Sequence, residues 1–136
     1  MKIGIDQRGA AAFEFCLVAV VFFTFVFAIF DLGRYAITMQ SLRSLVSEGA
    51  RATMIQCYTP QVTQNASPSG CTDVNTYYTN TYLTSLANIM GSTPTLSATT
   101  GASVLTITAS LPNFAMLMPI WGTSLNSPSA STSIPY

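Results

Sequence analysis

Charge is what this sequence has least of. Only 7% of its 136 residues are charged, whereas about 25% is typical of soluble domains. The charged side chains, five basic and five acidic, all lie between Lys2 and Asp73, and none follows Asp73. The formal net charge is zero, so the chain offers no basic face to nucleic acid.

Histidine is absent, and with it the commonest catalytic base. The many Ser and Thr hydroxyls have no imidazole to activate them as nucleophiles. The sequence also lacks a Gly-rich phosphate loop and the CxxC spacing of zinc or redox sites. We therefore expect no enzymatic activity, no cofactor, no metal site and no small-molecule substrate.

Cysteine is scarce, with three residues in the chain. Cys57 and Cys71 flank a segment rich in Pro, Asn, Ser and Gly, which is typical of a loop. A disulfide between them would stabilise the fold by about 3 kcal/mol in the chain-entropy model and would imply an oxidising compartment. Two unrelated thiols are the alternative. Cys16 lies in an apolar run, where we expect it to pack as a small hydrophobic residue.

A long apolar run is the most prominent feature that is present. In residues 15–30 Thr24 is the only polar side chain, and as a helix this stretch measures about 24 Å. Adding residues 10–13 extends it to about 30 Å, the thickness of the hydrocarbon core of a bilayer. The run predicts a membrane-spanning helix, and it encloses one carboxylate, Glu14.

The flanks of this run favour a signal anchor over a cleaved secretory signal peptide. Its apolar core exceeds the 7–15 residues usual for such peptides, and no small-x-small cleavage site follows it. Lys2 and Arg8 precede the run, so the N-terminus is expected on the cytoplasmic side and the rest of the chain outside.

The carboxylate of Glu14 needs a compensating charge, because an ionised group in hydrocarbon costs on the order of 3 kcal/mol. If Ala10 is counted as the first residue, Glu14 is the fifth and Phe15 the sixth. This spacing resembles the processing site of type IV prepilins, in which a short polar leader ends in Gly. The resemblance implies a leader of residues 1–9, cleavage between Gly9 and Ala10 by a prepilin peptidase, and pairing of Glu14 with a freed N-terminal amine in the filament.

Further motifs narrow this resemblance. They are an acidic residue at the membrane edge, Asp31, then Gly33-Arg34, and later Glu48-Gly49-Ala50-Arg51. With them, the region from Arg8 to about Met54 resembles the TadE-like family, which comprises minor pilins or pseudopilins of the tight-adherence (Tad, Flp) pilus. Members often carry a proline early in the apolar run. Residues 17–20 have none, so a kink in the membrane is in doubt.

The resemblance implies a structural subunit that assembles, initiates or caps a pilus and supports adhesion. Its expected partners are other pilins, the pilus assembly platform, the prepilin peptidase and the lipid of the bacterial inner membrane. The chain would start as a single-pass anchor with its head outside the cytoplasm and later reach the pilus or the cell surface.

Beyond the membrane the pattern becomes amphipathic, which predicts one helix continuing to about Met54. Gly33 is a candidate hinge in this helix, with close packing as the alternative. Glu48 and Arg51 are three residues apart, so a local ion pair is one expectation. The family resemblance suggests instead a contact with the head or with a neighbouring pilin.

The remainder is expected to form a small α+β head. Asp73 begins a predicted helix that stops at Gly91. Alternation predicts a strand over 103–111, paired as a hairpin with 95–99, and the tail 129–134 is a candidate third strand. The apolar residues 114–121 are interpreted as an irregular cover of the sheet. The predicted organisation is thus leader 1–9, helix 10–54 and head 55–136.

Two other classes remain open. An unprocessed single-pass envelope protein with an extracytoplasmic binding domain fits the anchor, but it has no use for Glu14. A pseudopilin of a type II secretion apparatus is disfavoured by the Glu14-Phe15 pair and by the Glu-Gly-Ala-Arg motif.

Overall fold

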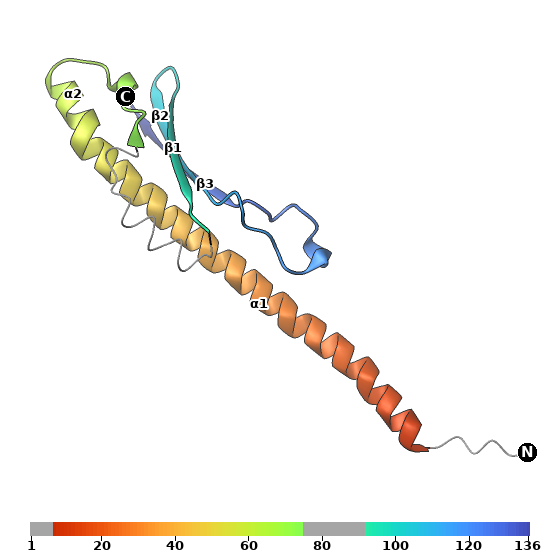
Figure 1. The fold of residues 1–136 in the computed structure, drawn as a ribbon. Helices are drawn as coiled ribbons and strands as arrows, with labels where there is room; N and C mark the ends of the chain where they lie inside the picture. The colour runs from red at the N-terminus through yellow and green to blue at the C-terminus, as the bar shows by residue number, and fades with distance from the viewer. Residues whose placement is uncertain (1–6, 75–91) are drawn as a thin grey trace, which may run out of the picture.

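One long helix organises the whole chain. The structure, a computed structural model, describes residues 7–74 and 92–136. Helix α1 runs from Gln7 to Thr53 and passes without a break into the π-helical turn η1 (Met54–Tyr58) and the short helix α2 (Thr59–Thr63). The head lies along one side of the C-terminal half of this helix, and the N-terminal half projects alone (Figure 1).

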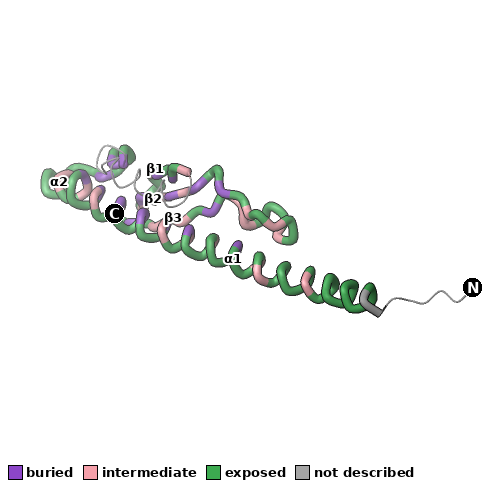
Figure 2. Tube along the Cα trace, turned by 60° about the horizontal axis from the view of Figure 1, so that its bottom comes forward, coloured by how far each residue is buried: buried purple, intermediate pink, exposed green. Residues whose placement is uncertain are grey.

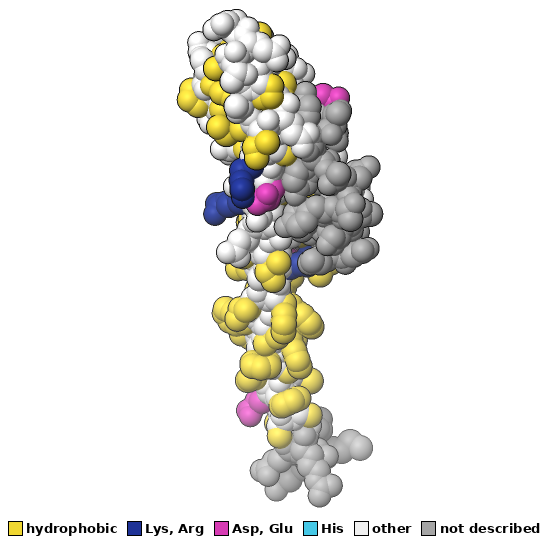
Figure 3. Space-filling model, turned by 90° about the vertical axis from the view of Figure 1, so that its left-hand side faces the viewer, with side chains coloured by type: hydrophobic (Ala, Val, Ile, Leu, Met, Phe, Trp, Pro, Cys, Tyr) yellow, Lys and Arg dark blue, Asp and Glu magenta, His cyan; other side chains and the backbone are white. Residues whose placement is uncertain are grey.

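The projecting half of α1 is apolar on all sides. From Gly9 to Phe30 no residue is buried within the chain, and large side chains such as Phe15 and Phe30 are each 72% exposed. An 18-residue window of this helix reaches a mean hydropathy of 2.6, so the helix is long and apolar enough to cross a membrane. Figure 3 shows hydrophobic side chains along the visible face of the helix below the head. The helix is continuous through residues 17–20, as the missing proline suggests.

The second half of α1 is amphipathic, and its buried stripe begins at Asp31. The buried residues recur at three- and four-residue intervals, which places them on one face of the helix. They are Asp31, Thr38, Leu42, Leu45, Val46, Gly49 and Thr53. Figure 2 shows this change from a helix half that is mostly exposed, with no buried residue, to a half with one buried face.

A three-stranded antiparallel sheet covers that face. Strand β1 (Thr95–Thr100) pairs with β2 (Val104–Ser110), and β2 pairs with β3 (Ser129–Pro135), so the central strand is β2. Leu105, Ile107 and Ala109 of β2 are fully buried while the residues between them are half-buried. Together with the leucines of α1 they form the core, so the head is a two-layer packing of one helix against one sheet.

Gly49 is a point of close approach between α1 and the side chain of Leu96 in β1. A Cβ atom placed on Gly49 would lie 2.9 Å from Cδ2 of Leu96, whose side chain is buried. Cβ contacts below about 3.0 Å force a neighbour to move, so glycine is the residue that fits here. Thr53 continues the same face and is fully buried, and its hydroxyl donates to the Gly49 carbonyl at 2.9 Å.

A disulfide joins Cys57 of η1 to Cys71, with Cα atoms 5.8 Å apart. It confirms the predicted bridge and ties the chain after the helix back to its end. Cys16, in contrast, is exposed on the projecting half of α1.

The predictions for the head are largely confirmed. The strand predicted from alternation and its hairpin partner are both present, the candidate strand in the tail is the third strand of the sheet, and the mixed helix and sheet class is correct. The helix predicted between Asp73 and Gly91 falls mainly on residues 75–91, outside the described residues.

Two expectations need correction. The helix continues past Met54 to Thr63, because the wider π turn accommodates Pro60, which has no N–H to donate. In this turn the Met54 carbonyl accepts hydrogen bonds from both the backbone N–H and the hydroxyl of Thr59. Residues 114–121 are irregular, as expected, with one 3₁₀ turn (η3, Pro119–Trp121), but only Phe114 is buried. The rest extends beyond the sheet alongside α1 (Figure 1).

Alanine substitutions at Gly33 and Gly49 of α1 are expected to differ in their effect on stability. In Gly33→Ala no atom of the described residues lies within 4 Å of the new methyl group, so better helix propensity should raise the free energy of unfolding by up to about 1 kcal/mol. In Gly49→Ala the same gain is opposed by the clash with Leu96. Urea unfolding in detergent micelles would measure both. Equal stabilisation by the two substitutions would contradict the close approach at Gly49.

Candidate functional site

The candidate functional site lies where the projecting apolar half of α1, from here on called the bare half, meets the head. We call this region the neck. We define it as Asp31, Arg34 and Tyr35 of α1 together with residues 114–118. The three helical residues are spaced i, i+3 and i+4, so they project from the same face of the helix. They occupy the first turn at which α1 is no longer apolar on all sides.

Asp31 makes the central contact of the neck. Its side chain is 3% exposed, and its carboxylate accepts hydrogen bonds from two consecutive backbone N–H groups. Leu117 N lies 3.2 Å from Oδ1 and 3.1 Å from Oδ2, and Met118 N lies 3.0 Å from Oδ2. Hydrogen bonds to a charged group contribute more than those between neutral groups, about 1.5–3 kcal/mol each. A carboxylate at the membrane edge is therefore compensated by the backbone of the head.

Arg34 and Tyr35 extend this contact on the same face. The Arg34 guanidinium donates to the carbonyl of Ala115 and lies 4.7 Å from the centroid of the Phe114 ring. The Tyr35 ring is 6.1 Å from the same ring, centroid to centroid. Phe114 thus lies near both a cation and an aromatic ring, which are favourable neighbours for its π system.

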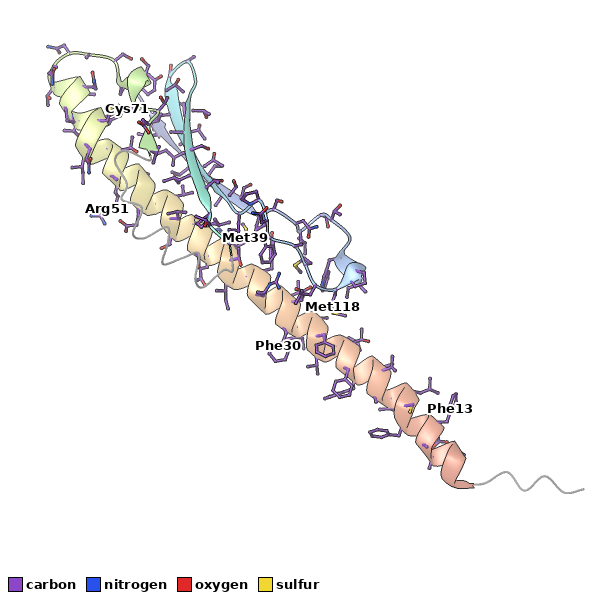
Figure 4. The ribbon with its side chains drawn as sticks, viewed as in Figure 1. Phe13, Phe30, Met39, Arg51, Cys71 and Met118 are labelled. Carbon is purple, nitrogen blue, oxygen red and sulfur yellow. A yellow bond between two sulfur atoms is a disulfide. The ribbon has the colours of Figure 1, made fainter. Side chains whose placement is uncertain are left out.

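Hydrogen bonds from other residues of the head also hold residues 114–118 in place. Met116 N donates to the side-chain oxygen of Asn126 at 3.0 Å, and Ser127 N donates to the Phe114 carbonyl at 3.0 Å. The Ser127 hydroxyl also donates to the Pro112 carbonyl at 2.9 Å. This segment is therefore fixed on both sides, by the head and by α1, and the neck joins the sheet to the start of the projecting apolar half of α1. Figure 4 labels Met118 beside α1 near the level of Phe30.

The Glu48-Gly49-Ala50-Arg51 motif lies on α1 between the neck and the C-terminal end of the helix. Its small residues face inward: Gly49 is buried against Leu96, and Ala50 packs at the edge of the core. Its charged residues face outward, and Glu48 and Arg51 form an exposed ion pair at 3.9 Å. The local-pair expectation is therefore observed, and such a pair contributes little to stability. The contact with the head comes from Gly49 and Ala50.

Glu14 and the expected cleavage position lie far from the neck, on the bare half of α1. Gly9, Ala10, Glu14 and Phe15 are all exposed and helical. Within the part of the chain that the structure describes, no salt bridge reaches Glu14. Gly33 is also open, with no atom of the described residues near its Cβ position, so close packing within the chain does not explain it.

The sequence motifs identified only part of the neck. They singled out Asp31, Gly33 and Arg34 but neither Tyr35 nor the segment that these residues contact. The spacing of Asp31, Arg34 and Tyr35 was a usable signal for a shared helical face. The partner of Asp31 had none, because its donors are backbone N–H groups 86 and 87 residues away.

Residues 9–51 match a family model described as TadE-like protein. The N-terminal part of this chain is TadE-like. The finding confirms the resemblance drawn from the motifs, and the matched range contains Glu14, all the helical residues of the neck and Gly49. The TadE-like segment thus includes the bare helix and most of the helical layer of the head, whereas residues 114–118 lie outside it. No curated protein and no solved structure matches the chain.

The neck predicts that Asp31→Ala destabilises the head. The substitution leaves the N–H groups of Leu117 and Met118 without their acceptor, so we expect the free energy of unfolding to fall by about 2–4 kcal/mol. Urea unfolding in detergent micelles, followed by the fluorescence of the single tryptophan, would measure it. Glu48→Ala is the matched control on the same helix, with an expected change within about 0.5 kcal/mol. Equal effects of the two substitutions would refute the role given to Asp31.

Proposed function

We propose that this chain is a minor pilin, or pseudopilin, of a tight-adherence pilus. In this proposal it is a structural subunit that serves assembly, initiation or capping of the fibre, and so supports adhesion to surfaces. The observation that carries the proposal is the bare apolar helix with Glu14 five residues after Gly9, within a segment that is TadE-like. TadE-like proteins are structural and pilin-like, which agrees with a chain that has no histidine.

The exposed apolar surface of α1 supports an anchor that contacts lipid first and the helices of other pilins later. Apolar surface is stabilised by about 25 cal/mol for each Å² removed from water, and the projecting half of the helix presents bulky apolar side chains all round. Lipid covers them while the chain is an inner-membrane anchor. In the fibre, the helices of other pilins take the place of lipid.

Glu14 supports processing of the leader, residues 1–9. Cleavage between Gly9 and Ala10 would create a positive amine at the start of the helix, and an exposed carboxylate one turn away suits such a charge. In the assembled fibre the amine of a neighbouring subunit would lie against Glu14 and offset the cost of placing that carboxylate among apolar helices. The prepilin peptidase and the assembly platform are the partners that these steps require.

The head supports a location outside the cytoplasm. The disulfide between Cys57 and Cys71 is typical of oxidising compartments, and the N-terminal charges favour a cytoplasmic N-terminus. The proposed organisation is a leader (1–9), an anchoring helix (10–54) and a head (55–136), with the neck fixing the head relative to the anchor.

The first experiment is mass spectrometry of the chain expressed with and without a prepilin peptidase. Loss of residues 1–9 only in the presence of the peptidase is the expected result, because the Gly9–Ala10 junction lies at the cytoplasmic end of the helix. A matched Gly9→Leu variant should remain intact with the peptidase. An unchanged N-terminus in every sample would contradict the pilin proposal and favour an unprocessed single-pass envelope protein whose head binds a partner.

A second experiment separates anchoring from assembly. Glu14→Gln removes the charge with little change in size, so we expect normal membrane insertion and loss of most piliation, scored by electron microscopy and by adhesion to a surface. Glu48→Gln is the control, because Glu48 is exposed and its ion pair is weak. Normal piliation by the Glu14→Gln cells would remove the charge-pairing role from the proposal.

A further inference from the structure

The loop of residues 117–121, which begins at the end of the neck, is apolar and largely exposed. Leu117 is 75% exposed and Ile120 is 59% exposed, and Pro119 between them is exposed as well. No charged residue follows Asp73 in the sequence, so nothing in this loop favours water strongly. Exposed apolar side chains gathered in one turn are uncommon without a partner surface.

The position of this loop is set by the neck. Leu117 and Met118 donate to Asp31, which holds the turn η3 against α1 on the membrane side of the sheet (Figure 1). Leu117 lines one shallow groove together with Phe27 and Phe30 of α1. Those two phenylalanines belong to the apolar run that spans the bilayer. The loop is therefore level with the outer end of the membrane-spanning segment and continuous with its apolar surface.

Trp121 closes the loop and suits the boundary between lipid and water. Tryptophan combines a large apolar ring with one polar N–H, which is why it is enriched where hydrocarbon meets headgroups. Its ring is partly exposed at the surface of the loop, while its indole N–H is turned inward and buried.

We propose that residues 117–121 form a second membrane contact, which enters the outer interface of the bilayer beside α1. The inference rests on the membrane anchor in the proposed function, but it adds a surface of the head that the anchor does not require. The occupant is lipid because the loop continues the lipid-facing band of α1 at the same level and carries no charge. Two contacts from one rigid neck would fix both the height and the rotation of the head above the membrane.

The contact has a consequence for assembly. A subunit that leaves the membrane must withdraw this loop from the interface together with α1. The loop would then be exposed again, or covered by the adjacent subunit of the fibre.

Trp121 allows a direct test because it is the only tryptophan in the chain. The full chain would be reconstituted in phosphatidylcholine vesicles with bromine on the acyl chains, near the headgroup or near the bilayer centre. We expect the shallow bromines to remove most of the fluorescence and the deep ones much less. The double variant W121F/I55W moves the reporter to an exposed site at the far end of the head. It should be quenched by aqueous acrylamide and not by either lipid.

A second pair of variants tests the same contact without moving the reporter. Ile120→Asp places a carboxylate in the loop, so the bromolipid quenching of Trp121 should fall several-fold. Ile55→Asp, at a similarly exposed apolar residue, should leave it unchanged.

Flotation of the same vesicles separates failure of the inference from failure of the anchor. A chain that floats with lipid but whose Trp121 is quenched only by acrylamide would refute the loop contact and leave the anchor intact. Shielding of Trp121 from both quenchers would also refute it and would indicate a protein cover, such as a second copy of the chain. A chain that does not float would refute the anchor and the loop contact together.

Discussion

The carboxylate of Asp31 is the contact on which the arrangement of this molecule depends. It lies at the point where α1 changes from a helix that is apolar all round to a helix with one buried face. By accepting from Leu117 N and Met118 N it joins the two parts of the chain that are most distant in function, the anchor and the irregular edge of the head. A buried charge of this kind costs free energy unless it is well paired. The pairing therefore also defines one orientation of the head.

The head uses the C-terminal half of α1 as one of its two layers. Leu42, Leu45 and Val46 of α1 belong to the core beneath β2 and β3, so the helix that carries the projecting apolar half also forms one layer of the fold. A three-stranded sheet with one apolar face needs a second layer to cover that face. The C-terminal half of α1 supplies this layer, and Gly49 lets the Leu96 side chain of β1 pack closely against the helix.

On the proposed function, the two halves of α1 satisfy opposite requirements. The outer half must stay fixed to the head, so its contacts are specific: a paired carboxylate, a cation over a ring and a glycine against a leucine. The bare half must exchange lipid for other helices, so its surface is nonspecific and apolar, with Glu14 as the one group that distinguishes a correct neighbour. The fold is thus held by specific contacts, whereas the surface that would change partners makes only apolar ones. This division is consistent with a subunit that is stored in a membrane before assembly.

Local patterns in the sequence determined the elements of this protein. The uninterrupted apolar run predicted the anchor, alternation predicted the strands, and the positions of Cys57 and Cys71 around a short segment predicted their bridge, because each of these depends on neighbours along the chain. Only the tertiary structure decided what the motif residues do. Asp31 meets backbone donors 86 and 87 residues away, and a backbone N–H leaves no mark in the amino-acid sequence. The continuation of the helix past Met54 was hidden for a similar reason, since a π turn that accommodates Pro60 is a change in backbone hydrogen bonding.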